Sequence, residues 1–509
     1  MSKPIDQHYR EYDDPKRLPD ALSQPEARAR VEKAVKRVNR ATTRSGKGER
    51  DAKRIKFSVE NGVPKLRFEA VAGFVSLGGL DAHIAPKVWP TPKGKPGSDD
   101  GSDTGAAVPD ANDHWRALLD RMLEVGGGRA GQAIAVLPDA LHAGLDERGL
   151  LEPIARYYAD RLLHALDEQP LMAYQRLRED TPFLRGGLRL VKQLTRPPHQ
   201  QHRLACEYSR LTKENPCVDL LRWANGMFYR LARLPSTRRR LAAAMERMGK
   251  SQRLPPPHVI ARLRSPVGAD PYKEPLEFAR ALYLSRERCG QRGSSKTTGV
   301  LIRMNDFFEA FVSGLYRRLA ARRGDGFRAT RQAVTPLAHS NWEGYRKDSG
   351  RHEVRPDDVL IQNDRVILTS DAKYKGRQPT TKDSKTYERI DAADLYQVIS
   401  ACVATNTPHG LVVRPAISQA RLDHPIDIWT TDQPVVTDTD IQAKIKAALT
   451  NSDPQAKDEA LRELQAIINH KITVGVVYLD LRNPGCDRWI TAQVDQLETA
   501  FEQVLGLTN

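Results

Sequence analysis

The chain has 509 residues, of which 39% are hydrophobic and 28% are charged, and its apolar runs are too short to span a bilayer. This length exceeds one ordinary hydrophobic core, so we expect about two to four domains and no membrane partner. The opening residues, MSKPIDQHYREYDDPK, lack the apolar stretch of a secretory signal, which predicts a cytoplasmic protein.

Charge and cysteine spacing narrow the class further. Lys and Arg number 80 against 64 Asp and Glu, giving a formal net charge of +16, which suits a polyanionic partner such as nucleic acid. The cysteines have no CxxC pair, which argues against structural zinc and against a disulfide scaffold. They are Cys206, Cys217, Cys289, Cys402 and Cys486.

The N-terminal third is expected to contain three segments. Residues 1–56 form a basic, partly disordered arm: positions 26–56 carry 12 Lys and Arg against four Asp and Glu, typical of a solvated, partly helical tail or of an arm lying along DNA. Residues 57–90 form a β-rich unit with turns at Asn61-Gly62 and Gly78-Gly79. Residues 91–113 are rich in Gly, Pro, Ser and Asp, which predicts a flexible linker.

Residues 114–289 have mainly helical periodicity, as in LLEPIARYYADRLLHAL, with a strand or loop at FLRGGLRLVKQL. The segment GQRGSSKTTG at 290–299 is not a phosphate loop, because Ser295 stands where GxxxxGK[ST] requires its second glycine. Residues 290–509 then alternate helices and strands: helices at 300–324, 384–405, 441–451, 458–470 and 489–506, and strands at 355–375, 409–415 and 472–481. This order predicts a mixed α/β, multidomain protein.

The hairpin RPDDVLIQNDRVILTSDAKYK at 355–375 carries the candidate chemistry. Asp371 and Lys373 are two apart on a strand, so they share one face. A two-residue turn at Asn363-Asp364 would pair position 357 with 370 and leave Asp357 on the opposite face. A three-residue loop or one β-bulge would pair 357 with 371 instead. If Asp357 and Asp371 form one site, the hairpin must have an odd-numbered loop or a bulge. Otherwise these charged side chains are solvent-exposed residues of a surface hairpin.

On one face, two carboxylates would converge beside an ammonium group. Mg²⁺ prefers such oxygen ligands and keeps waters for substrate, and a bound metal lowers the pKa of an attacking water. Lys373 could orient or deprotonate that water, or stabilise charge on phosphorus. Glu309 and Gln397, on flanking helices, could add a carboxylate and an amide; taken alone, each reads as an ordinary polar residue of a half-exposed helix.

Pro356-Asp357 followed by Asp371-Ala372-Lys373 resembles the PD-(D/E)xK nuclease superfamily. The closer resemblance is to McrC, the nuclease subunit of modification-dependent McrBC restriction systems, and it spreads over most of residues 57–415. It rests on the 355–375 hairpin, DLYQVISACVAT, GFVSLGGLDAHIAPKVW, LEPIARYYADRLL, LRGGLRL, CEYSRLTKENPCVDLLRWA and MNDFFEAFV. One departure is Ala401, where the family often has an aromatic residue.

The resemblance implies a C-terminal PD-(D/E)xK-type α/β nuclease domain at 290–509 and a partner-docking helical region at 114–289. It implies catalysis by Asp357, Asp371 and Lys373 with Glu309 and Gln397 in support. The metal, Mg²⁺ with Mn²⁺ as a substitute, would be held by Asp357, Asp371 and Glu309.

By the same resemblance, the chain would cut double-stranded DNA, modified or not, when assembled with a McrB-like AAA+ GTPase or ATPase. Two other hypotheses stay open from the residues. The first is a catalytically silent DNA-binding or docking subunit that activates the AAA+ partner. The second is a nuclease that works without a motor.

Overall fold

The residues that the structure describes form five β-sheets with helices packed beside them, which confirms the mixed α/β, multidomain class. The computed structural model describes residues 5–10, 15–42, 54–86, 111–138, 151–248, 254–290, 298–324, 326–339, 351–374, 391–416, 421, 423–431, 471–482 and 484–507. Most of the expected linker at 91–113, the expected helices at 441–451 and 458–470, and most of 290–299 lie outside these residues. No helix in the described ranges is long and apolar enough to cross a membrane.

The N-terminal body is built on a five-stranded sheet of order β1-β6-β5-β11-β7. Its strands are β1 (Ile5–Arg10), β5 (Val71–Leu77), β6 (Leu80–Ala85), β7 (Ile134–Pro138) and β11 (Thr298–Arg303). A three-stranded sheet completes this body, with β2 (Lys16–Arg17), β3 (Ile55–Glu60) and β4 (Val63–Phe68). β11 pairs with both β5 and β7, so the first described strand of the expected nuclease region at 290–509 belongs to the N-terminal sheet. Residues 300–303, expected to be helical, are part of this strand, and the helix begins at Met304. The domain boundaries taken from sequence stay predictions.

The expected basic arm contains a packed helix. After the short α1 (Asp20–Ser23), α2 (Pro25–Thr42) buries Val31, Ala34, Val35 and Val38 against the N-terminal sheets. Their spacing of three and four residues places them on one helical face, while Lys, Arg, Glu and Asn are frequent among the other positions. This part of residues 1–56 therefore differs from a solvated tail, because an apolar stripe lies within the charged sequence.

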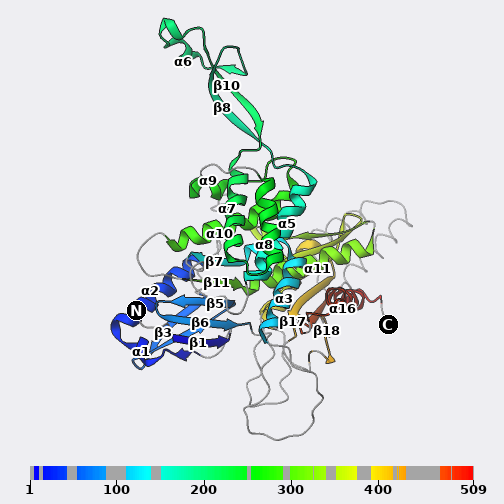
Figure 1. Cartoon of the computed structure of the whole chain (residues 1–509). Coiled ribbons are helices and arrows are strands. Elements are labelled where there is room, and N and C mark those ends of the chain that lie inside the picture. The colour runs from blue at the N-terminus through cyan, green and yellow to red at the C-terminus, as the bar shows by residue number, and fades with distance from the viewer. Residues whose placement is uncertain are drawn as a thin grey trace, which may run out of the picture.

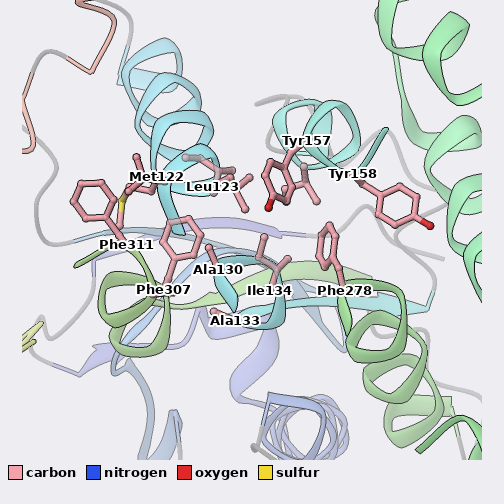
Figure 2. Close-up of a cluster of buried hydrophobic side chains, with 14 of the residues drawn as sticks. Met122, Leu123, Ala130, Ala133, Ile134, Tyr157, Tyr158, Phe278, Phe307 and Phe311 are labelled. Carbon is pink, nitrogen blue, oxygen red and sulfur yellow. The ribbon is translucent and has the colours of Figure 1, made fainter. Parts of the chain in front are cut away.

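The middle region is mainly helical, as expected. It contains α3 (Ala111–Gly126), α4 (Gly128–Gln132), α5 (Leu151–Glu168), α7 (Pro216–Leu231), α8 (Pro235–Arg247), α9 (Pro257–Arg262), the 3₁₀ turn η3 (Asp270–Tyr272) and α10 (Lys273–Gly290). Its core is continuous with that of α11 (Met304–Arg323), because one buried cluster includes side chains of α3, α4, α5, α10 and α11. In Figure 2, Met122 of α3 lies beside Phe307 and Phe311 of α11, and Tyr157, Tyr158 and Phe278 lie at the other end of the row. The helix that precedes the candidate site is thus fixed by the helical region.

One part of this region is not helical. Residues 173–212, which we call the finger, project away from the body (Figure 1). They comprise β8 (Ala173–Thr181), β9 (Gly187–Leu188), α6 (Leu190–Leu194), the 3₁₀ turn η2 (Pro198–Gln200) and β10 (Leu204–Thr212). β8 and β10 pair along all nine residues of each strand. The segment FLRGGLRLVKQL lies at the end of the finger as a short strand and a helix.

The C-terminal body contains a six-stranded sheet of order β12-β15-β16-β17-β19-β18. Its strands are β12 (Phe327–Arg331), β15 (Asp358–Gln362), β16 (Arg365–Ala372), β17 (His409–Pro415), β18 (Ile426–Thr430) and β19 (Thr473–Leu479), and β13 (Thr335–His339) pairs with β14 (Arg351–Val354) beside it. Leu411 and Val413 face the core shared with α11 and α16 (Trp489–Val504), whereas Val412 packs with α12 (Ala392–Thr405). Helices therefore cover both faces, and the central strands β17 and β19 carry the apolar runs GLVV and VGVVYL, as such burial favours.

Candidate active site

The hairpin of β15 and β16 has the register that a shared site requires. Its turn is the two-residue Asn363-Asp364, but the register shifts by one residue: Leu360 pairs with Leu368 and Ile361 with Val366, which leaves Ile367 as the extra residue of a β-bulge. Below the bulge Asp358 pairs with Ser370, so Asp357 lies opposite Asp371. The sequence-based prediction of an odd loop or a bulge is confirmed.

Asp371, Lys373 and Gln397 form a closed polar ring. Lys373 Nζ lies 2.5 Å from Asp371 Oδ2 and donates to Gln397 Oε1 at 2.9 Å. Gln397 Nε2, from α12, donates in turn to Asp371 Oδ1 at 3.2 Å. Asp371 is only 2% exposed, and this burial raises its pKa although Lys373 opposes the shift. Burial alone would lower the pKa of Lys373, but the Asp371 carboxylate outweighs it and the net shift is upward, so the ammonium keeps its proton.

Asp357 adds a second carboxylate beside that of Asp371. Its Oδ2 accepts a hydrogen bond from the backbone N–H of Ala372 at 2.9 Å. Burial, followed by the negative charges of Glu309 and Asp371, raises the pKa of Asp357 to about 9. Removal of acid groups from water together with mutual repulsion is the cause, and a bound cation would reverse it.

Glu309 lies near these groups but is already paired. Its Oε1 forms an ion pair with Arg331 at the end of β12 and accepts from Gln332 Nε2 at 3.1 Å. Over the residues that the structure describes, no group of three or more His, Cys, Asp or Glu side chains is arranged to hold a metal ion. The expected place of Glu309 among metal ligands stays a prediction.

The donor set at the hairpin nevertheless fits Mg²⁺. Proteins often hold this ion by one or two carboxylates, and waters and substrate phosphates fill the other positions. Asp357 and Asp371 supply two carboxylates side by side at the end of a sheet. Burial is the main cause of the raised pKa of both residues, and at Asp357 the negative charges of Glu309 and Asp371 add to it. A bound cation would offset those negative charges.

Several residues of this neighbourhood escaped the sequence analysis. Asp358 is 2% exposed and accepts from Ser313 Oγ at 2.7 Å, and burial raises its pKa to about 7. In the sequence, only its position directly after Asp357, in Pro356-Asp357-Asp358, could have pointed to it. The buried pair of Arg414 on β17 and Asp394 on α12, at 2.8 Å, joins the helix that carries Gln397 to the sheet.

Ala401, where the sequence departs from the family, lines a small cavity of about 10 Å³ with Pro356, Asp371 and Gln397.

Comparison with known proteins places the chain in a family. The model of the McrBC 5-methylcytosine restriction system component matches residues 66–413, about two thirds of the chain. No curated protein sequence matches.

Two similar solved structures come from Thermococcus gammatolerans. The first is a half-complex of McrB AAA+ hexamers with bound McrC: it has 16% identity and a TM-score of 0.45, and covers 97% of this chain and 100% of that chain. The second is the McrBC complex: it has 19% identity and a TM-score of 0.36, with 62% and 88% covered. Such TM-scores are too low to support a shared fold, so the family model carries the assignment. The chain belongs to the family of McrBC 5-methylcytosine restriction system components.

Proposed function

We propose that the chain is the McrC-like nuclease subunit of its restriction system, a Mg²⁺-dependent endonuclease that cuts double-stranded DNA together with an AAA+ NTPase. The observation that carries this proposal is the convergence of Asp357, Asp371, Lys373 and Gln397 at one end of β16, achieved by the bulge at Ile367. In this reading the six-stranded sheet with α11 and α12 is the PD-(D/E)xK-type nuclease domain.

The residues divide the work by charge. Asp357 and Asp371 would hold the metal, which when bound polarises the phosphodiester and lowers the pKa of an attacking water. Lys373 keeps its proton in this geometry, which suits orienting water and stabilising negative charge on the phosphate better than removing a proton. Gln397 fixes the positions of both Asp371 and Lys373 through its amide. Glu309 supports the site from outside while it is paired with Arg331.

The finger of the helical region has the features expected of a docking site for the AAA+ partner. Six apolar side chains of the finger are each more than 60% exposed, where an isolated protein would ordinarily leave polar residues: Tyr174, Phe183, Leu184, Leu190, Val191 and Leu194. Exposed apolar patches on a projecting element are typical of protein–protein interaction sites. In this proposal the finger docks on the motor, and the nuclease sheet is brought to DNA by the assembled complex.

The test is cleavage by the reconstituted complex. The chain, alone and with the AAA+ protein, is incubated with methylated and unmethylated plasmid, GTP or ATP, and Mg²⁺ or EDTA. We expect cleavage that EDTA abolishes and that Asp371→Asn lowers by at least about a thousandfold. Asp364→Asn is the matched control: Asp364 lies at the turn of the same hairpin and is almost fully exposed, so this variant should cut like wild type.

Each outcome of this test selects one hypothesis. Cleavage by the lone chain would identify a nuclease that works without a motor. DNA binding without cleavage in every mixture, with NTP hydrolysis by the partner intact, would identify the silent docking subunit and refute the nuclease proposal.

A further inference from the structure

The arginines of α11 differ in whether a carboxylate holds them. Five of them lie at or on this helix, and four form ion pairs: Arg303 with Asp306, Arg318 with Glu124, Arg322 with Asp495 and Glu498, and Arg323 with Glu498 and Glu502. Arg317 has no carboxylate within ion-pair distance among the described residues. It is exposed, and its Nε donates to the backbone oxygen of Ser313 at 3.4 Å.

Arg317 lies on the face of α11 that leads to the candidate site. Glu309, Ser313 and Arg317 are spaced by four residues, so they follow one another along one side of the helix. Ser313 hydrogen-bonds Asp358, the neighbour of Asp357, and Glu309 pairs with Arg331. Arg317 is therefore the solvent-facing end of a polar row that begins beside the carboxylates.

A second arginine reaches this row from the helical region. The junction of α3 and α4 lies directly on α11: a Cβ added at Gly126 would be 3.2 Å from the Ala310 carbonyl carbon, and one at Gly314 would be 2.1 Å from the Val125 oxygen. This close approach brings Arg129 of α4 beside Glu309's end of α11. Partial burial and the like charge of Arg331, with a smaller effect from Arg317, lower the pKa of Arg129, as expected if the three guanidinium groups are neighbours.

The nearby carboxylates have other partners. Glu274 of α10, whose raised pKa is opposed by the charge of Arg317, pairs with Arg161 at 3.6 Å. Glu309 is held by Arg331, and Glu277 of α10 accepts from Gln132 Nε2 at 2.6 Å. Within the described residues, Arg129 has no carboxylate at ion-pair distance either. Arg129 and Arg317 thus come from two different regions, and both are exposed residues near the Glu309–Arg331 pair. Guanidinium groups bind phosphate oxygens with two parallel hydrogen bonds, which makes such a pair suited to a nucleic-acid backbone.

We propose that Arg129 and Arg317 form a phosphate clamp that holds the DNA strand beside the scissile phosphate. Arg331 pairs with Glu309, so the Glu309 carboxylate does not compete with phosphate for Arg129 and Arg317. This inference rests on the proposed nuclease function and adds a consequence: the helical region supplies part of the substrate-binding surface. Docking of the motor on that region and binding of DNA at the nuclease sheet are then joined through the α4–α11 contact.

The test measures how DNA affinity depends on salt. Full-length chain in complex with its AAA+ partner is titrated with a duplex oligonucleotide in EDTA between about 50 and 200 mM salt, and cleavage kinetics are measured with Mg²⁺. Each contact with a phosphate contributes about 0.9 to the slope of log affinity against log salt. We expect Arg129→Ala and Arg317→Ala each to lower this slope by about 1, and the double variant by about 2. KM should rise about tenfold in the double variant while kcat changes less than about twofold.

Arg318→Ala is the matched control, because it removes the same charge from the same helix at a residue already paired with Glu124. It should leave the slope unchanged, and Arg129→Lys with Arg317→Lys should restore most of it. Complex formation and thermal melting of each variant exclude misfolding. An unchanged slope and KM in the double variant, with a wild-type enzyme that cuts, would overturn the clamp alone. Absence of cleavage by the wild type would instead refute the nuclease proposal.

Discussion

Two hairpins of this chain depart from the usual placement of side chains in opposite ways. The hairpin of β15 and β16 buries carboxylates, with Asp358 and Asp371 each 2% exposed. The finger exposes apolar side chains, with Val191 and Leu194 each at least 80% exposed. Buried charge and exposed apolar surface both cost free energy in an isolated chain. Each departure fits the function proposed above, in which the first hairpin binds a cation and DNA and the second binds a protein.

The two hairpins also differ in what holds them in place. β15 and β16 lie inside a six-stranded sheet between α11, α16 and α12, so their carboxylates are fixed by neighbours on several elements. The finger is held chiefly by its own ladder and by cross-strand pairs such as Arg178 with Glu207. A rigid position suits chemistry, whereas a projecting ribbon suits docking.

Loss of the site ammonium should give the largest effect. Lys373→Ala removes the positive charge 2.5 Å from Asp371, and we expect cleavage to fall by about 10²–10⁴-fold, as for other positioned groups in active sites. Binding of the AAA+ partner should stay within about twofold. Lys65→Ala is the control, because Lys65 pairs with Glu60 at 2.6 Å on a strand of the N-terminal body. Cleavage by Lys373→Ala at the wild-type rate would show that this hairpin is not the catalytic site.

The second prediction concerns the finger. Val191→Asp with Leu194→Asp places charge on apolar surface that would be buried on docking, so partner affinity should fall by about a hundredfold or more. Melting of the lone chain should not change, because both side chains are already in water. Gln201→Asp adds a charge at an exposed polar position of the finger and serves as the control. Undiminished affinity in the double variant would show that the finger is not a docking element.

The third prediction tests whether charge burial at the site hairpin costs stability. Burial raises the pKa of Asp358 to about 7 from an unfolded value near 4, so the folded state favours the neutral acid. That contribution is complete below about pH 4 and is lost as pH rises through 7. Asp358→Asn cannot ionise and keeps an acceptor for Ser313. Measured by urea unfolding in EDTA, its free energy of unfolding relative to wild type should increase between pH 5 and 8, by on the order of 2–4 kcal/mol. A pH-independent difference would contradict the prediction.

The sequence predicted those features that depend on residues close together in the chain. Strand periodicity and the position of Asn363-Asp364 were enough to predict an odd loop or a bulge between Asp357 and Asp371 if they share a site, and the structure has a bulge at Ile367. The family resemblance, and not the residues alone, assigned Gln397 to the same site, and its amide forms hydrogen bonds with both Asp371 and Lys373.

Other features depend on which distant segments pair, and no local pattern encodes that. The pair of Glu309 and Arg331 joins a helix to a strand, and β11 joins the sheet formed by residues near the N-terminus. In α2 the signal was present at Val31, Ala34, Val35 and Val38, but the density of Lys and Arg around it favoured a solvated arm. Charge composition is a poor guide to burial when an apolar stripe only a few residues wide can anchor a helix.

The smallest predicted effect separates the geometry of the site hairpin from its chemistry. Asn363 and Asp364 both have positive φ, 49° and 63°, in the two-residue turn, and glycine adopts this conformation without the cost that a side chain incurs. Asp364→Gly should relieve that cost but lose an exposed ion pair with Arg328 at 2.8 Å that contributes little. Local opening of the hairpin, measured by hydrogen exchange over residues 358–372, should become less favourable by about 0.5 kcal/mol. Arg328→Ala measures the ion pair alone. Cleavage should not change in either variant, because the bulge, not the turn, sets Asp357 opposite Asp371; a change in cleavage would show that the turn also sets the register.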